Sequence, residues 1–372
     1  MSAIVISGTG LFTPPHKVSN QELVDVLNTH VTKFNQENAQ AIEAGKIDEK
    51  KHSSVEFIEK ASGIKSRYVM YKNGITDVDV MCPKFNKNRP EQPPEMVLMA
   101  VEAAKQALEN AGKEAADIDM VILGSSNMQR SYPAMAVEVQ KLLGAGGYGY
   151  DMNVACSTAT FAIINAHNAI KAGTAKVVLV VNPEFTTPQL DYTNRDSHFI
   201  FGDVATAVIV EAQETAESDN QFKIVNTDQL TQFSNNIQCN HSYVDHCYDD
   251  LPYDNSYFFQ EGRKVFKELL PIVTSTISSH LDQVQWQVSD VKRMWLHQAN
   301  INMNLFAAKK LLGREPVFLD APLILDEYAN TASAGSVVAF HKYQDDFVSG
   351  DKGILCSFGA GYSVGCISLE KI

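Results

Sequence analysis

The stretch Asp151-Met-Asn-Val-Ala-Cys-Ser-Thr-Ala-Thr-Phe-Ala-Ile-Ile164 is the most informative part of this chain. A strand-like approach ends at Cys156, and an unbroken run of small residues typical of a helix begins directly after the thiol. A cysteine in the first turn of a helix faces unpaired backbone N–H groups and the positive end of the helix dipole, and both favour the thiolate. A buried structural cysteine is the alternative, because most cysteines are buried.

Two later strings each place a polar residue at the end of an apolar element. In Trp295-Leu-His-Gln-Ala-Asn300, His297 lies between a short apolar segment and a helical pattern. In Glu327-Tyr-Ala-Asn-Thr-Ala-Ser-Ala-Gly-Ser336, Asn330 precedes a small-residue helix start. Taken singly, such a histidine is more often a core residue, and such an asparagine is more often a helix cap. With Cys156 they form an ordered Cys, His and Asn set, which indicates nucleophilic catalysis by a thiol.

The residues around the cysteine separate two chemistries that use this order. Papain-like cysteine proteases carry a Cys-Gly-Ser-Cys-Trp type of context, whereas this chain has Val-Ala-Cys-Ser-Thr-Ala. Five strings, in family order, resemble the β-ketoacyl-acyl-carrier-protein synthase III enzymes of the thiolase-like condensing superfamily. They are Ala155-Cys156, Ile200-Phe-Gly-Asp203 with Ala205-Thr-Ala-Val-Ile-Val, His297-Gln-Ala-Asn300, Asn330-Thr-Ala-Ser-Ala and Ser357-Phe-Gly-Ala-Gly361.

The resemblance implies an acyltransferase that makes a carbon–carbon bond without a cofactor or a metal. Cys156 would take an acyl group from acyl-CoA, and the backbone N–H groups of Cys156 and Ala360 would stabilise the oxyanion. His297 and Asn330 would hydrogen-bond the thioester oxygen of malonyl-acyl carrier protein while CO2 leaves. The product would be a 3-oxoacyl-acyl carrier protein, as in the initiation of fatty acid synthesis.

The substrate-delivery residues depart in part from the family pattern. Arg195 matches a family arginine near the CoA nucleotide, which suits a phosphate-bearing ligand. Phe57 and Ala61 stand where the family commonly has a tryptophan and an arginine, so Phe57 is expected to stack but a charge is missing. Tyr132 matches an aromatic residue that limits the acyl pocket of the partner subunit.

Two lysines match the basic pair with which the family docks the acidic carrier protein. These are Lys309 and Lys310, whereas Asn302 replaces an arginine often found just after the His-Gln-Ala-Asn string. A solvated helix face explains the two lysines equally well from charge pattern alone.

Other functions stay open at the level of sequence. A related ketosynthase could take medium or long acyl chains or make a secondary metabolite. A cysteine hydrolase or a nondecarboxylating thiolase is a further alternative, although Cys356 lies within an apolar strand-like run and therefore favours packing over proton transfer. Outside the enzymes, a noncatalytic homologue that binds acyl carrier protein is an alternative that the intact Cys, His and Asn set disfavours.

Composition predicts a cytoplasmic metabolic enzyme. The 372 residues, 45% of them hydrophobic, suffice for a large core and two domains. A net charge of −13 argues against nucleic acid as the main partner. The apolar N-terminal run is too short for a signal peptide, no segment approaches a membrane span, and the six cysteines are expected to be reduced.

Strand-like and helical runs alternate along the chain, which predicts a layered α/β fold. Residues 289–296 echo 116–123, each after a helix and an acidic turn, so two similar halves are predicted at 1–215 and 216–372. The resemblance implies the five-layered αβαβα thiolase fold and a homodimer. Insertions near 19–51 and 71–94 are expected on the surface, where they could cover the mouth of the substrate channel.

A last cluster, Cys239-Asn-His-Ser-Tyr-Val-Asp-His-Cys247, combines two thiols and two imidazoles. Zinc prefers such ligands, but the spacing fits no standard zinc motif. We therefore expect no metal there.

Overall fold

The computed structural model describes residues 2–85, 91–240 and 257–372. Within these residues, nine strands form one hydrogen-bonded sheet in the order β11-β12-β13-β8-β1-β7-β6-β4-β5. The strand bounds are β1 Ile4–Phe12, β4 Met120–Gly124, β5 Tyr148–Met152, β6 Val177–Glu184, β7 Val204–Ala212, β8 Phe222–Ser234, β11 Val291–Leu296, β12 Lys352–Gly359 and β13 Gly361–Lys371. Short pairs are formed by β2 His16–Ser19 with β3 Ser66–Val69, and by β9 Ile237–Cys239 with β10 Phe258–Gln260.

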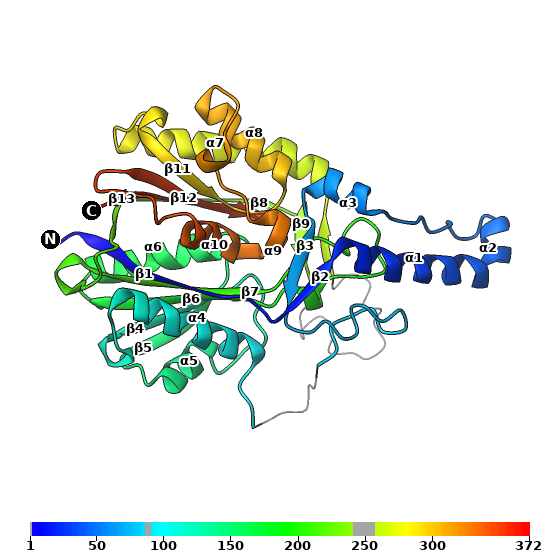
Figure 1. Cartoon of the computed structure of the whole chain (residues 1–372), viewed down its shortest axis with the longest axis horizontal. Coiled ribbons are helices and arrows are strands. Elements are labelled where there is room, and N and C mark those ends of the chain that lie inside the picture. Colours follow the sequence, from blue (N-terminus) through cyan, green and yellow to red (C-terminus); the bar gives the residue numbers. More distant parts are fainter. Residues whose placement is uncertain (1, 86–90, 241–256) are drawn as a thin grey trace.

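The sheet has two parts, one formed by β11, β12, β13 and β8 and the other by β1, β7, β6, β4 and β5. The helices cover the outer face of each part and fill the space between the two. Their bounds are α1 Asn20–Glu37, α2 Ala39–Glu43, α3 Val55–Ser62, α4 Glu95–Ala111, α5 Met135–Leu143, α6 Thr158–Lys171, α7 Gly262–Gln283, α8 Ile301–Leu312, α9 Leu325–Tyr328 and α10 Gly335–Lys342. Helices α4 and α5 cover one outer face, α7 and α8 cover the other, and α6 and α10 lie between the two parts (Figure 1). This arrangement confirms the predicted five-layered α/β fold.

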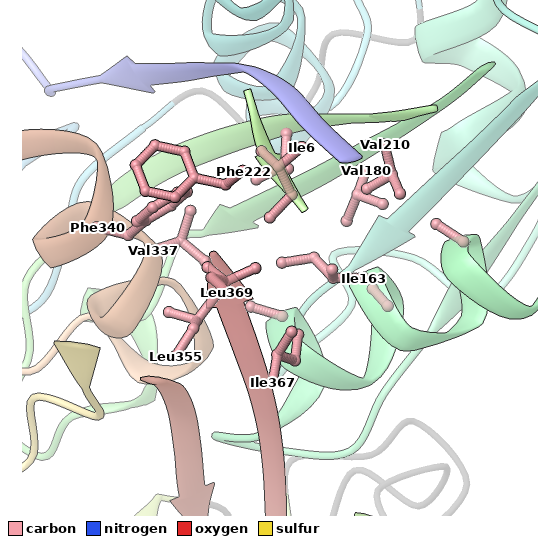
Figure 2. Close-up of a cluster of buried hydrophobic side chains, with 14 of the residues drawn as sticks. Ile6, Ile163, Val180, Val210, Phe222, Val337, Phe340, Leu355, Ile367 and Leu369 are labelled. Carbon is pink, nitrogen blue, oxygen red and sulfur yellow. The ribbon is translucent and has the colours of Figure 1, made fainter. Parts of the chain in front are cut away.

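The apolar core of the middle layer joins elements from distant parts of the sequence. Figure 2 shows Ile163 of α6, Val180 of β6, Val337 of α10 and Leu369 of β13 in one cluster, all of them buried. Burial of such side chains stabilises the fold by roughly 1.5–3 kcal/mol each. The middle helices therefore join the two parts of the sheet.

Small residues allow α6 to lie close to strands on both sides. A Cβ atom at Gly124 of β4 would overlap the methyl group of Thr158, and one at Gly365 of β13 would overlap the Thr160 hydroxyl. Any larger residue at these two glycines would push α6 away. The small-residue run after Cys156 is thus explained by a helix packed between two parts of the same sheet.

Local structure repeats where the sequence echo was seen. A short 3-10 turn, Ala115–Asp117, precedes β4, and a second one, Val288–Asp290, precedes β11. Both turns follow a long helix, α4 or α7. The domain boundary near residue 215 remains a prediction.

The two insertions differ in structure. Ser19 caps α1 and forms a capping box with Glu22, and α1 and α2 project from the body of the molecule (Figure 1). Residues 71–85 and 91–94, the described part of the second insertion, contain no helix or strand. That either insertion covers a substrate channel stays a prediction.

Within the described ranges, no helix has both the length and the apolar character needed to cross a lipid bilayer.

Candidate active site

Cys156 lies in a tight turn immediately before α6. The helix begins at Thr158 with Ser157 as its N-cap residue, so the thiol precedes the first turn instead of lying in it. Ala155 has a left-handed backbone with φ of 46°, and its N–H donates to Asn153 Oδ1 at 2.8 Å. Gly359, at the end of β12, approaches the cysteine so closely that a Cβ there would overlap Cys156 Cβ and Sγ. The thiol is thus held between the start of α6 and the end of β12.

Burial governs the acidity of this thiol. Burial raises the pKa of Cys156 to about 11, and the negative charge of Glu184 acts in the same direction. Hydrogen bonds from the backbone N–H groups of Ala360 and Cys156 lower that pKa in part. Desolvation thus opposes the expected stabilisation of the thiolate by backbone donors, which stays a prediction.

The same backbone donors bear on the predicted oxyanion site. The N–H groups of Cys156 and Ala360 both act on the Cys156 sulfur, so they lie beside the atom to which an acyl group would be attached. This placement agrees with the predicted oxyanion role, which stays a prediction.

His297 follows β11 directly and is almost completely buried. Its backbone N–H donates to Cys356 O of β12 at 2.9 Å, and its ring meets Phe358 edge-on at 5.4 Å between centroids. Burial lowers the pKa of His297 to about 4, and the backbone of Ala332 acts weakly in the opposite direction. The imidazole is therefore neutral at neutral pH.

Asn330 lies in the turn between α9 and α10. Its Oδ1 atom accepts a hydrogen bond from Ala332 N–H at 2.9 Å, which leaves the amide N–H₂ group available to another acceptor. Its backbone pairs with the Ile200-Phe-Gly-Asp203 string: Asn330 N–H donates to Ile200 O at 3.0 Å, and Gly202 N–H donates to Asn330 O at 3.1 Å. These two hydrogen bonds therefore fix the position of the Asn330 backbone.

Asp203 secures that string. Its buried carboxylate accepts N–H groups of Met70, Thr186 and Thr187 and the Thr187 hydroxyl, all at 2.9 Å. Burial raises the pKa of Asp203 to about 6, against the effect of those hydrogen bonds. The family string thus acts here through its backbone and through a structural carboxylate.

Strand β12 brings the three predicted catalytic residues together. Gly359 contacts Cys156, the neighbouring Phe358 contacts the His297 ring, and the backbone of Ala332, next to Asn330, interacts with that same ring. The residues come from both predicted halves of the chain. Their convergence agrees with the predicted site, whose catalytic roles the geometry alone leaves untested.

The structure also brings Phe57 and Arg195 together. The Arg195 guanidinium lies 3.6 Å from the centre of the Phe57 ring, and Arg195 Nε donates to His52 O at 2.7 Å. Ala61, one turn further along α3, accepts a hydrogen bond from Asn300 at the start of α8. Phe57 and Arg195 thus lie where α3, α8 and the loop before Phe199 meet.

Three further predicted residues lie on exposed surface. Lys309 and Lys310 are in the last turn of α8, where Lys309 pairs with Glu315. Tyr132 is 85% exposed, and its predicted role at a partner's acyl pocket stays a prediction.

A buried residue that the sequence reading missed is Glu184, at the end of β6. Its carboxylate accepts hydrogen bonds from Ser126 and Ser333, and its charge acts on the Cys156 thiol. The sequence carried a signal for Glu184, because it is a polar residue at the end of an apolar strand, just as His297 directly follows one.

A cavity of about 340 Å³ opens beside the cysteine turn. Val154, Ala155 and Ala360 line it on one side, and Thr231 to Phe233 of β8 line it on the other. Cys239 is the described end of the Cys239 to Cys247 cluster, most of which lies outside the described residues. Among the residues described, no three His, Cys, Asp or Glu side chains form a metal site.

Comparison with known families supports the resemblance. A family model described as 3-oxoacyl-[acyl-carrier-protein (ACP)] synthase III matches residues 150–230, and the model of the corresponding C-terminal region matches residues 281–371. These two regions contain Cys156, His297 and Asn330.

Two relatives and one solved structure show the extent of the similarity. A beta-ketodecanoyl-[acyl-carrier-protein] synthase of Pseudomonas aeruginosa is 53% identical over 349 residues, which cover 94% of this chain and 100% of the relative. A beta-ketoacyl-[acyl-carrier-protein] synthase III of Bartonella henselae is 31% identical over 285 residues, which cover 74% of this chain and 84% of the relative. The crystal structure of a 3-oxoacyl-[acyl-carrier-protein] synthase III from Aquifex aeolicus matches with a TM-score of 0.77 at 24% identity over 99% of both chains, which shows the shared fold.

Proposed function

The chain belongs to the 3-oxoacyl-[acyl-carrier-protein] synthase III family of condensing enzymes, and we propose that it condenses an acyl thioester with malonyl-acyl carrier protein. One observation carries this proposal. Gly359 and Phe358 of β12 bring Cys156 and the His297 ring to one buried site, where burial raises the pKa of the thiol and lowers that of the imidazole. A papain-like cysteine hydrolase instead depends on a thiolate whose pKa a histidine lowers.

The first half-reaction is the acylation of Cys156. The sulfur attacks the thioester carbonyl of the donor, the bond to the donor sulfur breaks, and the thiol proton leaves with the released donor thiol. The oxyanion of the tetrahedral intermediate lies beside the N–H groups of Cys156 and Ala360. The acyl group then remains on Cys156 as a thioester.

The second half-reaction forms the carbon–carbon bond. Malonyl-acyl carrier protein loses CO2, and the electron pair of the broken bond becomes an enolate on the thioester. The neutral His297 N–H and the free amide N–H₂ of Asn330 donate to the enolate oxygen. The enolate carbon attacks the acyl-cysteine, the bond to Sγ breaks, and Cys156 leaves as a thiolate that takes a proton from the solvent.

We further propose that the donor is a medium-length acyl group. The relative from Pseudomonas aeruginosa is named for a beta-ketodecanoyl product. Malonyl supplies two of the ten carbons of such a chain after loss of CO2, so an eight-carbon donor is the first choice. The cavity beside Ala155 and Ala360 is the candidate place for this chain.

The alternative of a thiolase has less support. Thiolases use a second cysteine as an acid–base group, whereas Cys356 is completely buried beside Cys366 of β13. Its carbonyl group is used to hold His297.

The assembly and the location of the enzyme are proposed as follows. Two copies associate through the edge strand β5, which brings the exposed Tyr132 of each copy towards the partner. Acyl carrier protein docks near Lys309 and Lys310, and acyl-CoA or acyl carrier protein supplies the donor. The free cysteines Cys82, Cys156, Cys239, Cys356 and Cys366 suit a cytoplasmic location, where thiols stay reduced.

Intact-mass spectrometry with a panel of acyl thioesters tests the proposal. Wild-type protein should gain one acyl group, most efficiently from an octanoyl donor, and Cys156→Ala should gain none. Addition of malonyl-acyl carrier protein should then release CO2 and free the thiol. Loss of the acyl group to water without malonyl would show a hydrolase, and no acylation by any donor would show a binding protein.

A further inference from the structure

Glu184 is a buried carboxylate at the centre of the site. It ends β6, is completely buried, and lies at the junction of three chain segments. Burial raises its pKa, against the effect of its hydrogen bonds to Ser126 and Ser333. A carboxylate without exposure to water needs such donors to compensate for its desolvation.

The two oxygens of Glu184 join the two predicted halves of the chain. Oε1 accepts Ser126 N–H at 2.9 Å and Ser333 N–H at 3.1 Å, and it also accepts the Ser333 hydroxyl. Oε2 accepts the hydroxyl groups of Ser126 at 2.7 Å and Ser125 at 3.2 Å. Ser125 and Ser126 follow β4, whereas Ser333 follows Asn330 in sequence.

From Ser333, the contacts lead to two of the proposed catalytic residues. Ser333 is the neighbour of Ala332, whose N–H holds Asn330 Oδ1 at 2.9 Å. The backbone of Ala332 also interacts with the His297 imidazole. A shift of Ser333 would therefore also shift the backbone of Ala332, which contacts both Asn330 Oδ1 and the His297 imidazole.

From Ser126, the contacts lead to the cysteine turn. Asn153 Nδ2 donates to Ser126 O at 3.1 Å, and Asn153 Oδ1 accepts Ala155 N–H at 2.8 Å. Ala155 directly precedes Cys156. One carboxylate thus supports the turns that carry the nucleophile and the thioester-binding pair.

We propose that Glu184 is a positioning residue for condensation: its carboxylate holds the segment after Asn330 where Asn330 and His297 can bind the malonyl thioester. The proposal rests on the condensing function proposed above. Glu184 acts through Ser333 and Ala332, so its loss should affect decarboxylation more than acylation.

Glu184→Ala and Glu184→Gln separate position from charge. Alanine removes the bridge and should lower the condensation rate about 10- to 100-fold, while acylation of Cys156 falls only a few-fold. Glutamine keeps the length: its oxygen can accept the two N–H groups and its amide can donate to the serine hydroxyls. It should therefore restore condensation to within about fivefold of wild type.

Glutamine also gives a readout that a merely structural role would not change. The charge of Glu184 opposes the thiolate of Cys156, so Glu184→Gln should be alkylated by iodoacetamide several-fold faster than wild type at pH 8. This measurement and the acylation need no malonyl carrier protein. Alkylation that is no faster in Glu184→Gln would argue against a charged Glu184 close to the thiol and so against the proposal. A wild type that is unable to condense would refute only the proposed function.

Glu211→Ala is the matched control. Glu211 of β7 is equally buried and accepts the hydroxyl groups of Ser7 at 2.5 Å and Thr215 at 2.6 Å, but none of its bonds leads to the site. Its loss should lower the melting temperature and reduce acylation and condensation in the same proportion. If Glu184→Ala does not fold, Ser333→Ala, which removes one hydroxyl donor, should show a smaller fall in condensation with acylation retained.

Three results would overturn the proposal. Condensation by Glu184→Ala within about twofold of wild type would show that the bridge is dispensable. An equal loss of acylation and condensation, as in the control, would show a structural role. A loss in Glu184→Gln as large as in Glu184→Ala would show that the charge is required and not the position.

Discussion

Burial controls the chemistry of the individual residues in this site. Cys156 and His297 lose hydration together, which raises the pKa of the thiol to about 11 and lowers that of the imidazole to about 4. Both groups are consequently uncharged across the neutral range. A neutral imidazole still has one N–H to donate to an enolate oxygen, and its lowered pKa makes it a weak general base, so the site suits decarboxylation better than general-base catalysis.

The acidity of Cys156 makes a prediction about pH. Because the thiolate is the reactive form and the pKa is raised to about 11, the thiolate fraction rises about tenfold per pH unit below that value. Alkylation of Cys156 by iodoacetamide should therefore increase steadily from pH 7 to pH 9 without a plateau. Peptide mass spectrometry measures the rate at this residue, with Cys156→Ser as the control. A plateau below pH 8 would reveal a thiolate stabilised by an ion pair.

The two hydrogen-bond donors give a second prediction at this scale. His297→Ala and Asn330→Ala should each lower condensation by about 10²-fold or more, because each removes a proposed donor to the developing enolate. Acylation of Cys156 should remain, since its oxyanion faces backbone N–H groups. The two steps are measured by intact mass and by CO2 release. Normal condensation in both variants would refute the assignment.

Sequence reasoning located these residues but not their electrostatics. Cys156, His297 and Asn330 each stand where an apolar run ends, and this pattern was readable. The raised pKa of Cys156 was not, because it depends on burial by residues such as Gly359 and on the charge of Glu184, which are distant in sequence. The role of Glu184 was hidden for the same reason.

At the scale of elements, α8 links the site to the surface. His297 precedes its first turn and Asn300 caps it, whereas Lys309 and Lys310 lie in its last turn. Exposed Leu305 and Phe306 lie on the same helix. An acidic carrier protein bound at the end of α8 would therefore have its prosthetic arm near the helix start.

Lys310 tests this docking surface. Lys309 is paired with Glu315, whereas Lys310 has no ion-pair partner among the described residues. Lys310→Glu should raise KM for malonyl-acyl carrier protein about three- to tenfold with little change in kcat, because exposed charges contribute modestly to association. The difference should shrink at high salt. Lys105→Glu on α4, on the opposite side of the molecule, is the control, and an equal rise in KM there would argue against docking at α8.

The elements themselves were largely readable from the sequence. The echo of residues 116–123 at 289–296 corresponds to β4 and β11, each of which follows a short 3-10 turn. The start of α6 was placed too early, because Ala155 has a positive φ that places Cys156 in a turn. An alanine rarely adopts a positive φ, so its presence in the sequence does not predict this conformation, which depends on tertiary contacts.

At the scale of the whole molecule, β5 leaves one side of the sheet open. In the described residues it ends the strand order and has β4 as its neighbour. Val137 and Leu142 of α5 and Tyr148 of β5 are exposed beside this edge. The layered fold and its family were predicted from the sequence motifs. The alternation of strands and helices in one chain, however, does not specify which edge of the sheet a second copy covers.

The proposed homodimer supplies the last prediction. Wild-type protein should sediment at about twice the 41.0 kDa of one chain, and Tyr148→Asp should sediment as a monomer, because a charge at the joined edges would lie buried without a partner. The monomer should also lose activity with medium-length donors, since Tyr132 would no longer reach the partner's acyl pocket. Val348→Asp, at another exposed apolar position, should leave both properties unchanged. A wild-type monomer that is fully active, or a Tyr148→Asp protein that stays dimeric, would exclude assembly through β5.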